Sequence, residues 1–245
     1  MTQFIYSINA PEALDANRFG PKAANVARLG SWGLPIPAGF CLDAAAYRAQ
    51  VKALGLEADA RGVMSATESP QARRHALNMK LGLLDQPIIP EILDPLLAAR
   101  EQLMAETGAL MCVRSSALVE DRYGSSFAGQ FESFIGIENE ADFVLAVKSC
   151  WGALWMTRAL RYMATHDIDP AETAMGVLVQ PLVSARAAGG GLVGDLDAGS
   201  LGHRGGHSLL KVKATCWPLR MTPSCTRHTA RRPRYESAAR LVTRA

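Results

Sequence analysis

Apolar residues recur at helical spacing in several stretches of the chain and form strand-like runs in others. Helical patterns cover residues 44–51, 70–84 and 90–107, and a longer one follows Asn139 through Trp151 to about Tyr162. Strand-like runs cover residues 33–40, 109–113, 131–137 and 175–183. Residues 55–69 are loose in composition and carry no clear period. The pattern predicts helices and strands as far as about residue 186.

Helix starts are marked by specific residues. Pro21 fits a first helical position, where its missing N–H costs nothing, and apolar residues then recur at helical spacing to about Gly30. Asp43 and Asn139 are suitable N-caps for the helices that follow them. Lys22 is therefore expected in the first turn of its helix, where backbone N–H groups and an ammonium can point at one anion. The alternative is that Lys22 is solvated surface.

Candidate phosphate chemistry is concentrated between Val113 and Gly136. Arg114 follows an apolar run and is expected at a strand end, with Ser115 and Ser116 directly after it. Small residues then form a loop, residues 124–130, in which backbone N–H groups can approach a ligand closely. An ordinary surface turn is the alternative interpretation of that loop.

Four ordered stretches resemble one known family. They are Phe19-Gly20-Pro21-Lys22-Ala23-Ala24-Asn25-Val26-Ala27-Arg28-Leu29, Gly33-Leu34-Pro35-Ile36-Pro37-Ala38-Gly39-Phe40, residues 113–130, and Gly176-Val177-Leu178-Val179-Gln180. In this order they resemble the N-terminal nucleotide-binding domain of the phosphoenolpyruvate synthase and pyruvate phosphate dikinase family, which includes rifampicin phosphotransferase. The resemblance extends to about Arg186.

The resemblance implies an α+β, ATP-grasp-like fold of mixed sheets that holds ATP between two lobes, of which this chain contains an incomplete part. It implies that Lys22 and Arg114 hold the ATP phosphates, with Arg114 also catalytic, that Gly129 and its loop cover them, and that Ser133 and Gln180 line the nucleotide site. Gln180 could equally be a core residue whose side-chain amide is hydrogen-bonded within the fold. Mg²⁺ is implied as a second ligand. No residue is assigned to it, because the family's glutamine-arginine-proline signature and the acidic ligands before it are absent here.

The implied function is the ATP-binding portion of a phosphotransferase, a kinase that passes a phosphoryl group from ATP through an enzyme histidine to pyruvate or a similar small acceptor. One alternative is a catalytically inactive remnant that binds ATP without turnover. Another, less favoured, is a basic-tailed nucleic-acid-binding protein. The oligomeric state is not indicated by the sequence.

Charge divides the chain into two parts. Residues 187–245 carry ten Lys and Arg against three Asp and Glu, a net charge of +7, which leaves −4 for residues 1–186 within the total of +3. We therefore expect a nucleotide-binding domain over 1–186 and a basic Gly- and Arg-rich tail over 187–245. The tail shows poor periodicity, and the expectation is that it is poorly structured, from a shifted reading frame or a premature end. Its His and Cys spacings match no zinc module.

Composition and the lack of membrane or signal segments indicate the broad class of protein. The chain has 245 residues, 49% of them hydrophobic, which is enough for a substantial core. No apolar run is long enough for a membrane span and no signal-peptide pattern is present, so a cytoplasmic protein with no membrane partner and five reduced cysteines is expected. Trp151 and Trp155, four residues apart on a predicted helix, are interpreted as core residues. Arg73, Arg74 and His75 are interpreted as a solvated helix face.

Overall fold

The structure is a computed structural model that describes residues 3–63, 69–119, 131 and 133–184. Gly129, the loop around it and the basic tail lie outside the described residues. The strands are β1 (Ile5–Ser7), β2 (Phe40–Leu42), β3 (Met111–Ala117), β4 (Ser133–Ile137) and β5 (Met175–Pro181). The helices are α1 (Ala16–Ser31), α2 (Ala44–Ala53), α3 (Glu57–Gly62), α4 (Pro70–Asp85), α5 (Pro90–Thr107), α6 (Glu140–Gly152) and α7 (Thr157–Thr165), with short 3₁₀ turns η1 (Pro11–Leu14) and η2 (Ala153–Trp155).

The strands form one sheet in the order β1-β2-β5-β3-β4. All four pairings are antiparallel, and the longest ladder joins β3 to β5 from Met111 opposite Pro181 to Ala117 opposite Met175. The mixture of helices and sheet confirms the α+β class. The expectation of mixed sheets is wrong for the described residues, because every strand runs opposite to its neighbours.

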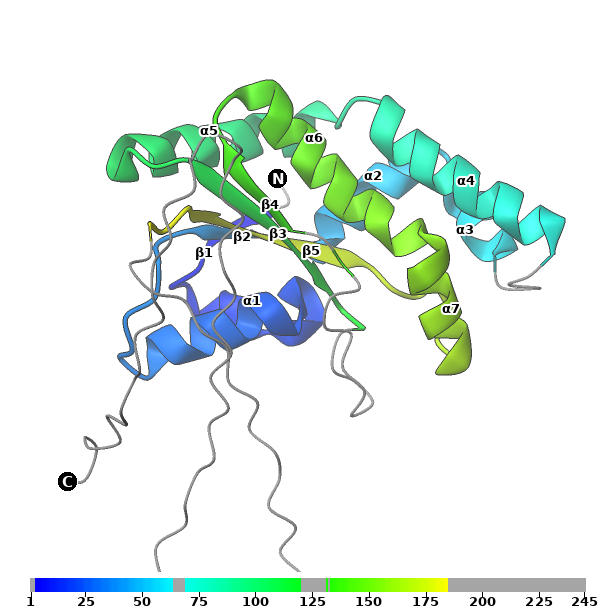
Figure 1. Cartoon of the computed structure of the whole chain (residues 1–245), viewed down its shortest axis with the longest axis horizontal. Helices are drawn as coiled ribbons and strands as arrows, with labels where there is room; N and C mark the ends of the chain where they lie inside the picture. Colours follow the sequence, from blue (N-terminus) through cyan, green and yellow to red (C-terminus); the bar gives the residue numbers. More distant parts are fainter. Residues whose placement is uncertain (1–2, 64–68, 120–130, 132, 185–245) are drawn as a thin grey trace, which may run out of the picture. The chain divides into compact units, whose positions relative to one another are not determined.

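Helices cover the two faces of the sheet unequally (Figure 1). On one face α1 packs against Leu178 of β5 and Cys41 of β2, through Phe19, Ala23 and Ala27. The opposite face carries the larger core, into which α2, α4, α5 and α6 direct apolar side chains. Strand alternation explains the division, since Val177 and Val179 face the large core while Leu178 between them faces α1.

Several predicted helix boundaries are confirmed. α4 and α5 begin at Pro70 and Pro90, and Asp43 and Asn139 cap α2 and α6 by accepting backbone N–H bonds at 2.8 Å from Ala45 and Asp142. Pro21 follows a kink in α1 at Gly20, whose backbone has φ 76° and ψ 159°. Pro21 therefore opens the main segment of α1, as predicted, although the helix as a whole starts earlier, at Ala16.

Other expectations are corrected. Only Phe40 of the predicted strand 33–40 is in a strand, because Pro35 and Pro37 cannot donate to a ladder. The loose stretch 55–69 contains the short helix α3. The long helix after Asn139 is interrupted by η2 and by the extended backbone of Met156, at φ −75° and ψ 143°. Helical spacing alone cannot detect such a break, since the apolar stripe continues across it.

Buried tryptophans hold the helical layer together. Trp151 is completely buried and Trp155 nearly so, which confirms that both are core residues. Trp155 donates its indole N–H to the hydroxyl of Tyr47 on α2 at 2.9 Å, a buried bond that joins η2 to the first half of the chain. No helix in the described ranges combines the length and apolarity that a bilayer crossing requires.

Candidate nucleotide site

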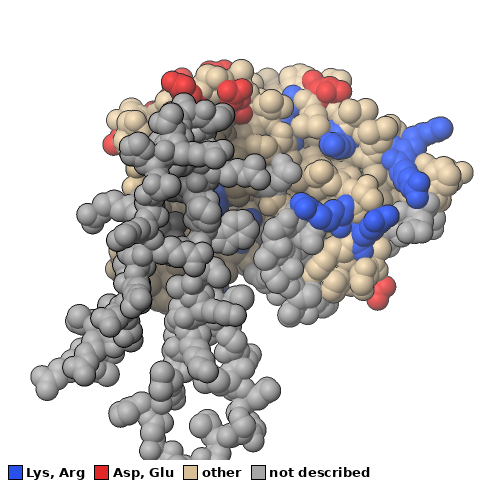
Figure 2. Space-filling model, viewed as in Figure 1, with Lys and Arg blue, Asp and Glu red and all other residues tan. Residues whose placement is uncertain are grey.

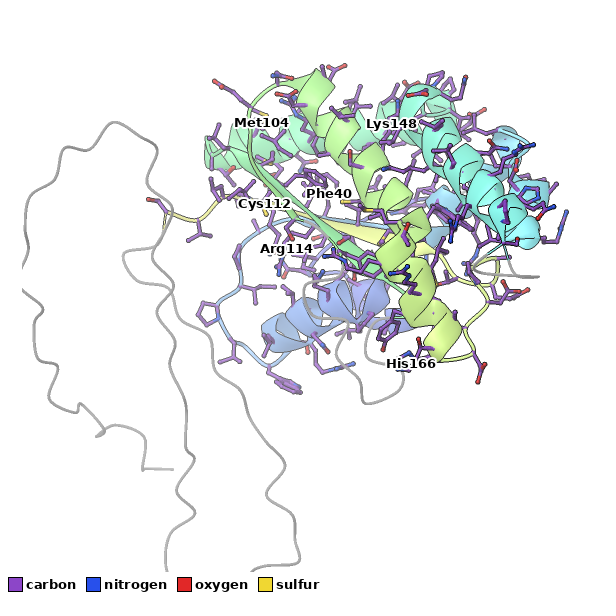
Figure 3. The ribbon with its side chains drawn as sticks, turned by 45° about the vertical axis from the view of Figure 1, so that its right-hand side comes forward. Phe40, Met104, Cys112, Arg114, Lys148 and His166 are labelled. Atoms are coloured by element: carbon purple, nitrogen blue, oxygen red, sulfur yellow. The ribbon has the colours of Figure 1, made fainter. Side chains whose placement is uncertain are left out.

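Arg114 lies in the middle of β3, with a partner strand on each side. The sequence placed it at a strand end, but β3 continues through Ser115 and Ser116 to Ala117. The Cα partner of Arg114 is Ser133 in β4 on one side and Leu178 in β5 on the other. Directly opposed residues project from the same face of an antiparallel pair, so Ser133 and Arg114 share the face that α1 covers in part. Figure 3 shows Arg114 on that side of the sheet.

β4 exposes the face that it shares with Arg114. Phe134 packs against the large core, whereas Ser133 is exposed and Ile135 is 68% exposed. The strand predicted over residues 131–137 is confirmed from Ser133 to Ile137. Ser133 is therefore on the accessible face, which is the side that a ligand can reach.

Gln180 is almost fully buried near the end of β5, and both ends of its amide are used. Its Oε1 lies 3.5 Å from Nη1 of Arg114, at the long limit for a hydrogen bond, and its Nε2 donates to the carbonyl of Pro37 at 3.3 Å. These bonds link β3, β5 and the irregular segment before β2. Gln180 thus contacts the guanidinium directly, which the sequence did not indicate.

Lys22 reaches the same strand from α1. Its Nζ donates to the backbone carbonyl of Ser115, the residue after Arg114, at 2.5 Å. The N–H of Ala23 donates to Oγ of the buried Ser116 at 3.1 Å. One of the helix N–H groups expected to face an anion is therefore already used by a side chain of the sheet. The ammonium and the guanidinium are nevertheless anchored on adjacent residues of β3.

Gly20 makes this close approach possible. A Cβ atom on Gly20 would lie 2.3 Å from the carbonyl oxygen of Ser116, and its backbone conformation is one that residues with side chains avoid. Neither Gly20 nor the carbonyl of Pro37 was singled out from the sequence. The only available signal for Gly20 was a glycine directly before Pro-Lys, which by itself is common.

Cys112 is a further neighbour that the sequence did not assign. It is the ladder partner of Gln180 and lies two residues from Arg114 on the same strand face. Burial raises the pKa of its thiol above the ordinary value, and the nearby Arg114 guanidinium opposes part of that rise. At neutral pH the thiol is protonated, so it adds no negative charge beside the two cations.

The predicted site residues are brought together as far as the structure describes them. Lys22, Arg114, Ser133 and Gln180 surround one short section of β3, whereas Gly129 lies outside the described residues. Within the described ranges, no group of three or more His, Cys, Asp or Glu side chains forms a possible metal site. A cavity of about 830 Å³ between α4, η2 and α7 is lined by other residues.

Comparison with known proteins shows the family of this chain. The family model described as pyruvate phosphate dikinase, AMP/ATP-binding domain, matches residues 16–200. The chain is 32% identical over 177 residues to the phosphoenolpyruvate synthase of Aeropyrum pernix, covering 69% of this chain and 22% of the relative. It is 31% identical over 186 residues to an uncharacterized phosphotransferase of Bacillus subtilis, YvkC. This alignment covers 76% of this chain and 20% of the relative.

A third relative is similar over more of the chain. It is the prodigiosin synthesizing transferase PigC of Serratia marcescens, 32% identical over 216 residues, which cover 88% of this chain and 22% of the relative. This alignment and the family match both continue beyond Arg186, where the motif-based resemblance ends. The chain spans about a fifth of the length of these relatives. Because the family model covers most of the sequence, the chain belongs to the family of the pyruvate phosphate dikinase AMP/ATP-binding domain.

Proposed function

We propose that this domain binds ATP through Lys22 and Arg114 and serves as the ATP-binding portion of a phosphotransferase. The observation that carries the proposal is the convergence of two cations and a buried amide on one section of β3. A polyphosphate is stabilised by fixed cations, and charge-assisted bonds to phosphate oxygens are the strong ones. Family membership supports ATP as the ligand.

The roles follow from the contacts of each side chain. Lys22 would exchange its bond to the Ser115 carbonyl for a phosphate oxygen, and Arg114, held at one edge by Gln180, would offer its remaining N–H groups. Ser133 presents a hydroxyl from the neighbouring strand. Gln180 would orient the guanidinium as well as line the nucleotide site, and Gly129 with its loop would cover the phosphates.

The complete reaction would transfer the γ-phosphoryl group of ATP to an enzyme histidine and then to pyruvate or a similar small acceptor. In that reaction these residues would position the nucleotide and offset the charge that develops on the phosphoryl oxygens. Positioning and electrostatic stabilisation are the main contributions of a protein to phosphoryl transfer. Mg²⁺ would supply further charge neutralisation when bound with ATP. The described residues offer it no ligand cluster, so we assign it no protein ligand.

Binding without turnover is the second candidate. Both candidates require the same ATP site, so binding must be measured separately from hydrolysis. Calorimetry with MgATP on the 245-residue chain tests binding, and release of phosphate from ATP in the same preparation tests turnover.

The decisive variants are Lys22→Ala and Arg114→Ala. Each removes one charge-assisted contact worth about 1.5–3 kcal/mol, so each should weaken ATP binding roughly 10- to 150-fold. Lys52→Ala is a matched control, because Lys52 is an exposed cation on α2 outside the site. Unchanged affinity in both site variants, with measurable binding in the parent, would remove the assignment.

A further inference from the structure

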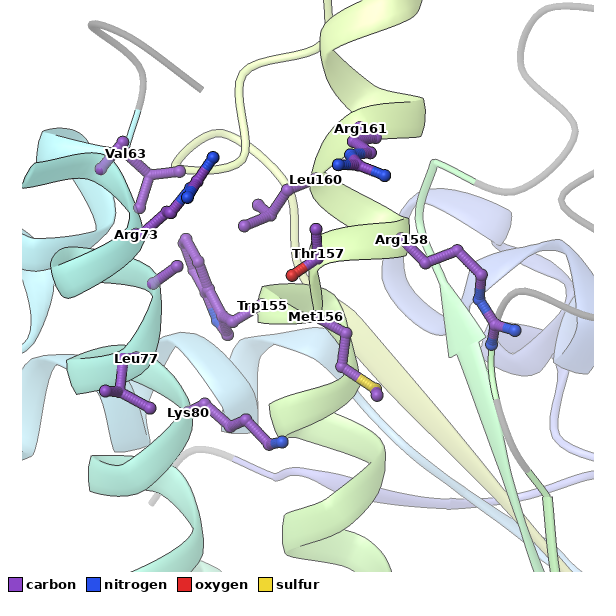
Figure 4. A pocket seen from close by; sticks show the side chains of 12 residues that line it. Val63, Arg73, Leu77, Lys80, Trp155, Met156, Thr157, Arg158, Leu160 and Arg161 are labelled. Atoms are coloured by element: carbon purple, nitrogen blue, oxygen red, sulfur yellow. The ribbon is translucent and has the colours of Figure 1, made fainter. Parts of the chain in front are cut away.

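A second basic site lies away from the candidate nucleotide site, in a pocket between α4, η2 and α7. Its volume is about 830 Å³, and Figure 4 shows the side chains that line it. Pockets for small organic ligands commonly have volumes of about 300–1,000 Å³. The pocket therefore has room for a small molecule.

Four cations of the described part of the chain line this pocket. Arg73 and Lys80 come from α4, and Arg158 and Arg161 come from α7, while the lining residues within the described ranges include no Asp or Glu. The described residues as a whole are slightly acidic, with 14 Lys and Arg against 16 Asp and Glu. Figure 2 shows basic side chains gathered over the region of α4 and α7, with acidic ones mainly along another edge. The positive charge is thus local rather than general.

This concentration of charge does not stabilise the fold. Like charges on facing helices repel, and no described carboxylate lies within salt-bridge distance of Arg73, Lys80 or Arg161. Arg158 lies on the far side of α7 from Trp155 and has interactions of its own, so the argument depends on the other three. A bound anion would relieve their repulsion.

The pocket also has an apolar wall. The Trp155 ring lies between Arg73 and Lys80 and is only 3% exposed, so it forms the buried floor of this wall. Leu77 is 52% exposed beside it, and Met156 and Leu160 complete the apolar side. Exposed aliphatic surface next to cations suits a ligand that has an apolar body and an anionic group.

We propose that this pocket binds a small organic anion, a molecule with an aromatic or aliphatic body and a phosphate, sulfonate or carboxylate group. The body would pack on Leu77 and Met156, and the anionic group would lie among Arg73, Lys80 and Arg161. The site is separate from the ATP site in its residues and does not depend on the proposed function. A small ligand is favoured over an acidic protein segment because the cations surround a hollow rather than follow a flat surface.

A pair of dyes separates the anionic contribution from the apolar one. 8-Anilinonaphthalene-1-sulfonate and N-phenyl-1-naphthylamine have the same ring system, but only the first carries a sulfonate. Fluorescence titration of the full chain should show tighter binding of the sulfonate dye. Arg73→Gln and Arg161→Gln should each weaken it about tenfold, as expected for loss of one charge-assisted contact, and leave the neutral dye unaffected.

Arg74→Gln is the matched control, since Arg74 is the next residue on α4 and does not line the pocket. This variant should bind both dyes with the affinity of the parent. Thermal melting of each variant checks that the fold is retained; these side chains project from helix surfaces.

Three results would overturn the proposal. They are equal affinity of the parent for both dyes, parent-like binding of the sulfonate dye in Arg73→Gln and Arg161→Gln, and displacement of that dye by hexaglutamate at lower concentration than by phenyl phosphate. The last result would identify the surface as a docking site for an acidic protein segment. Displacement by phenyl phosphate at the lower concentration supports the small-ligand site.

Discussion

Gly20 of α1 lies against the backbone of Ser116 in β3, with room for no side chain between them. A Cβ on Gly20 would fall 2.3 Å from the Ser116 carbonyl oxygen and 2.4 Å from its Oγ. The same serine accepts the N–H of Ala23, so this contact sets how closely the helix that carries Lys22 approaches the sheet. The position of the proposed phosphate-binding ammonium therefore depends on a glycine.

Gly20→Ala should lower the free energy of unfolding by about 2–5 kcal/mol, because it combines an unfavourable backbone conformation with a clash against backbone atoms. Gly33→Ala is the matched control. Gly33 also has a positive φ, 79°, but a Cβ there would meet nothing within 4 Å, so about 1 kcal/mol is expected. Urea unfolding of both variants measures the difference, and equal losses would contradict the proposed role of the Ser116 contact.

Gln180→Met should reduce the free energy of ATP binding by more than it reduces the free energy of unfolding. The substitution keeps the side-chain size but removes the bonds to Arg114 and to the Pro37 carbonyl, at a stability cost of about 1–2 kcal/mol. Calorimetry and urea unfolding give the two quantities.

Gln50→Met provides the control for that substitution. Gln50 is equally buried and bonds to the backbone of Pro87 and Ile89, away from the site. It should lose similar stability and keep full ATP affinity. If Gln50→Met loses as much affinity as Gln180→Met, the amide of Gln180 acts only through stability.

Tyr47→Phe should destabilise the chain by about 1–3 kcal/mol, because it leaves the buried indole N–H of Trp155 without its acceptor. Trp155→Phe removes the donor instead, and the double variant should lose less than the sum of the two single losses. Thermal or urea unfolding of the four chains completes the cycle. Strict additivity would show that this bond contributes nothing specific.

Alkaline pH should destabilise the fold through Cys41. Burial raises the pKa of its thiol from 9.0 to about 12. Between these values the thiol ionises in the unfolded chain and stays neutral in the folded one, so stability is complete below pH 9 and falls as pH rises towards 12. One such group contributes a slope of at most about 1.4 kcal/mol per pH unit.

Cys41→Ala tests this assignment, because it removes the titrating group and should flatten the loss of stability above pH 9. Burial also raises the pKa of Tyr47, although the bond from Trp155 opposes part of that rise, so some alkaline sensitivity should remain in the variant. Urea unfolding at several pH values above 8 measures the slope. An identical slope in the parent and in Cys41→Ala would exclude this thiol as the cause.

The sequence by itself determined the features that depend on neighbouring residues in the chain. Pro70, Pro90, Asp43 and Asn139 mark helix starts because proline and capping side chains act within one turn. The motifs around Lys22 and Arg114 likewise indicated the family, which comparison of the whole chain then showed. Local chemistry was enough for these conclusions.

Only the tertiary structure decided which distant residues meet. The antiparallel strand order places Gln180 beside Arg114, 66 positions earlier, and the kink at Gly20 brings Lys22 to the carbonyl of Ser115. The sequence indicates a solvated helix face for Arg73 and assigns no role to Arg161, and the break at η2 turns α7 so that they line one pocket. Hydrophobic periodicity specifies which face of an element is buried, but the partner of that face is set by long-range packing, which the spacing of apolar residues does not encode.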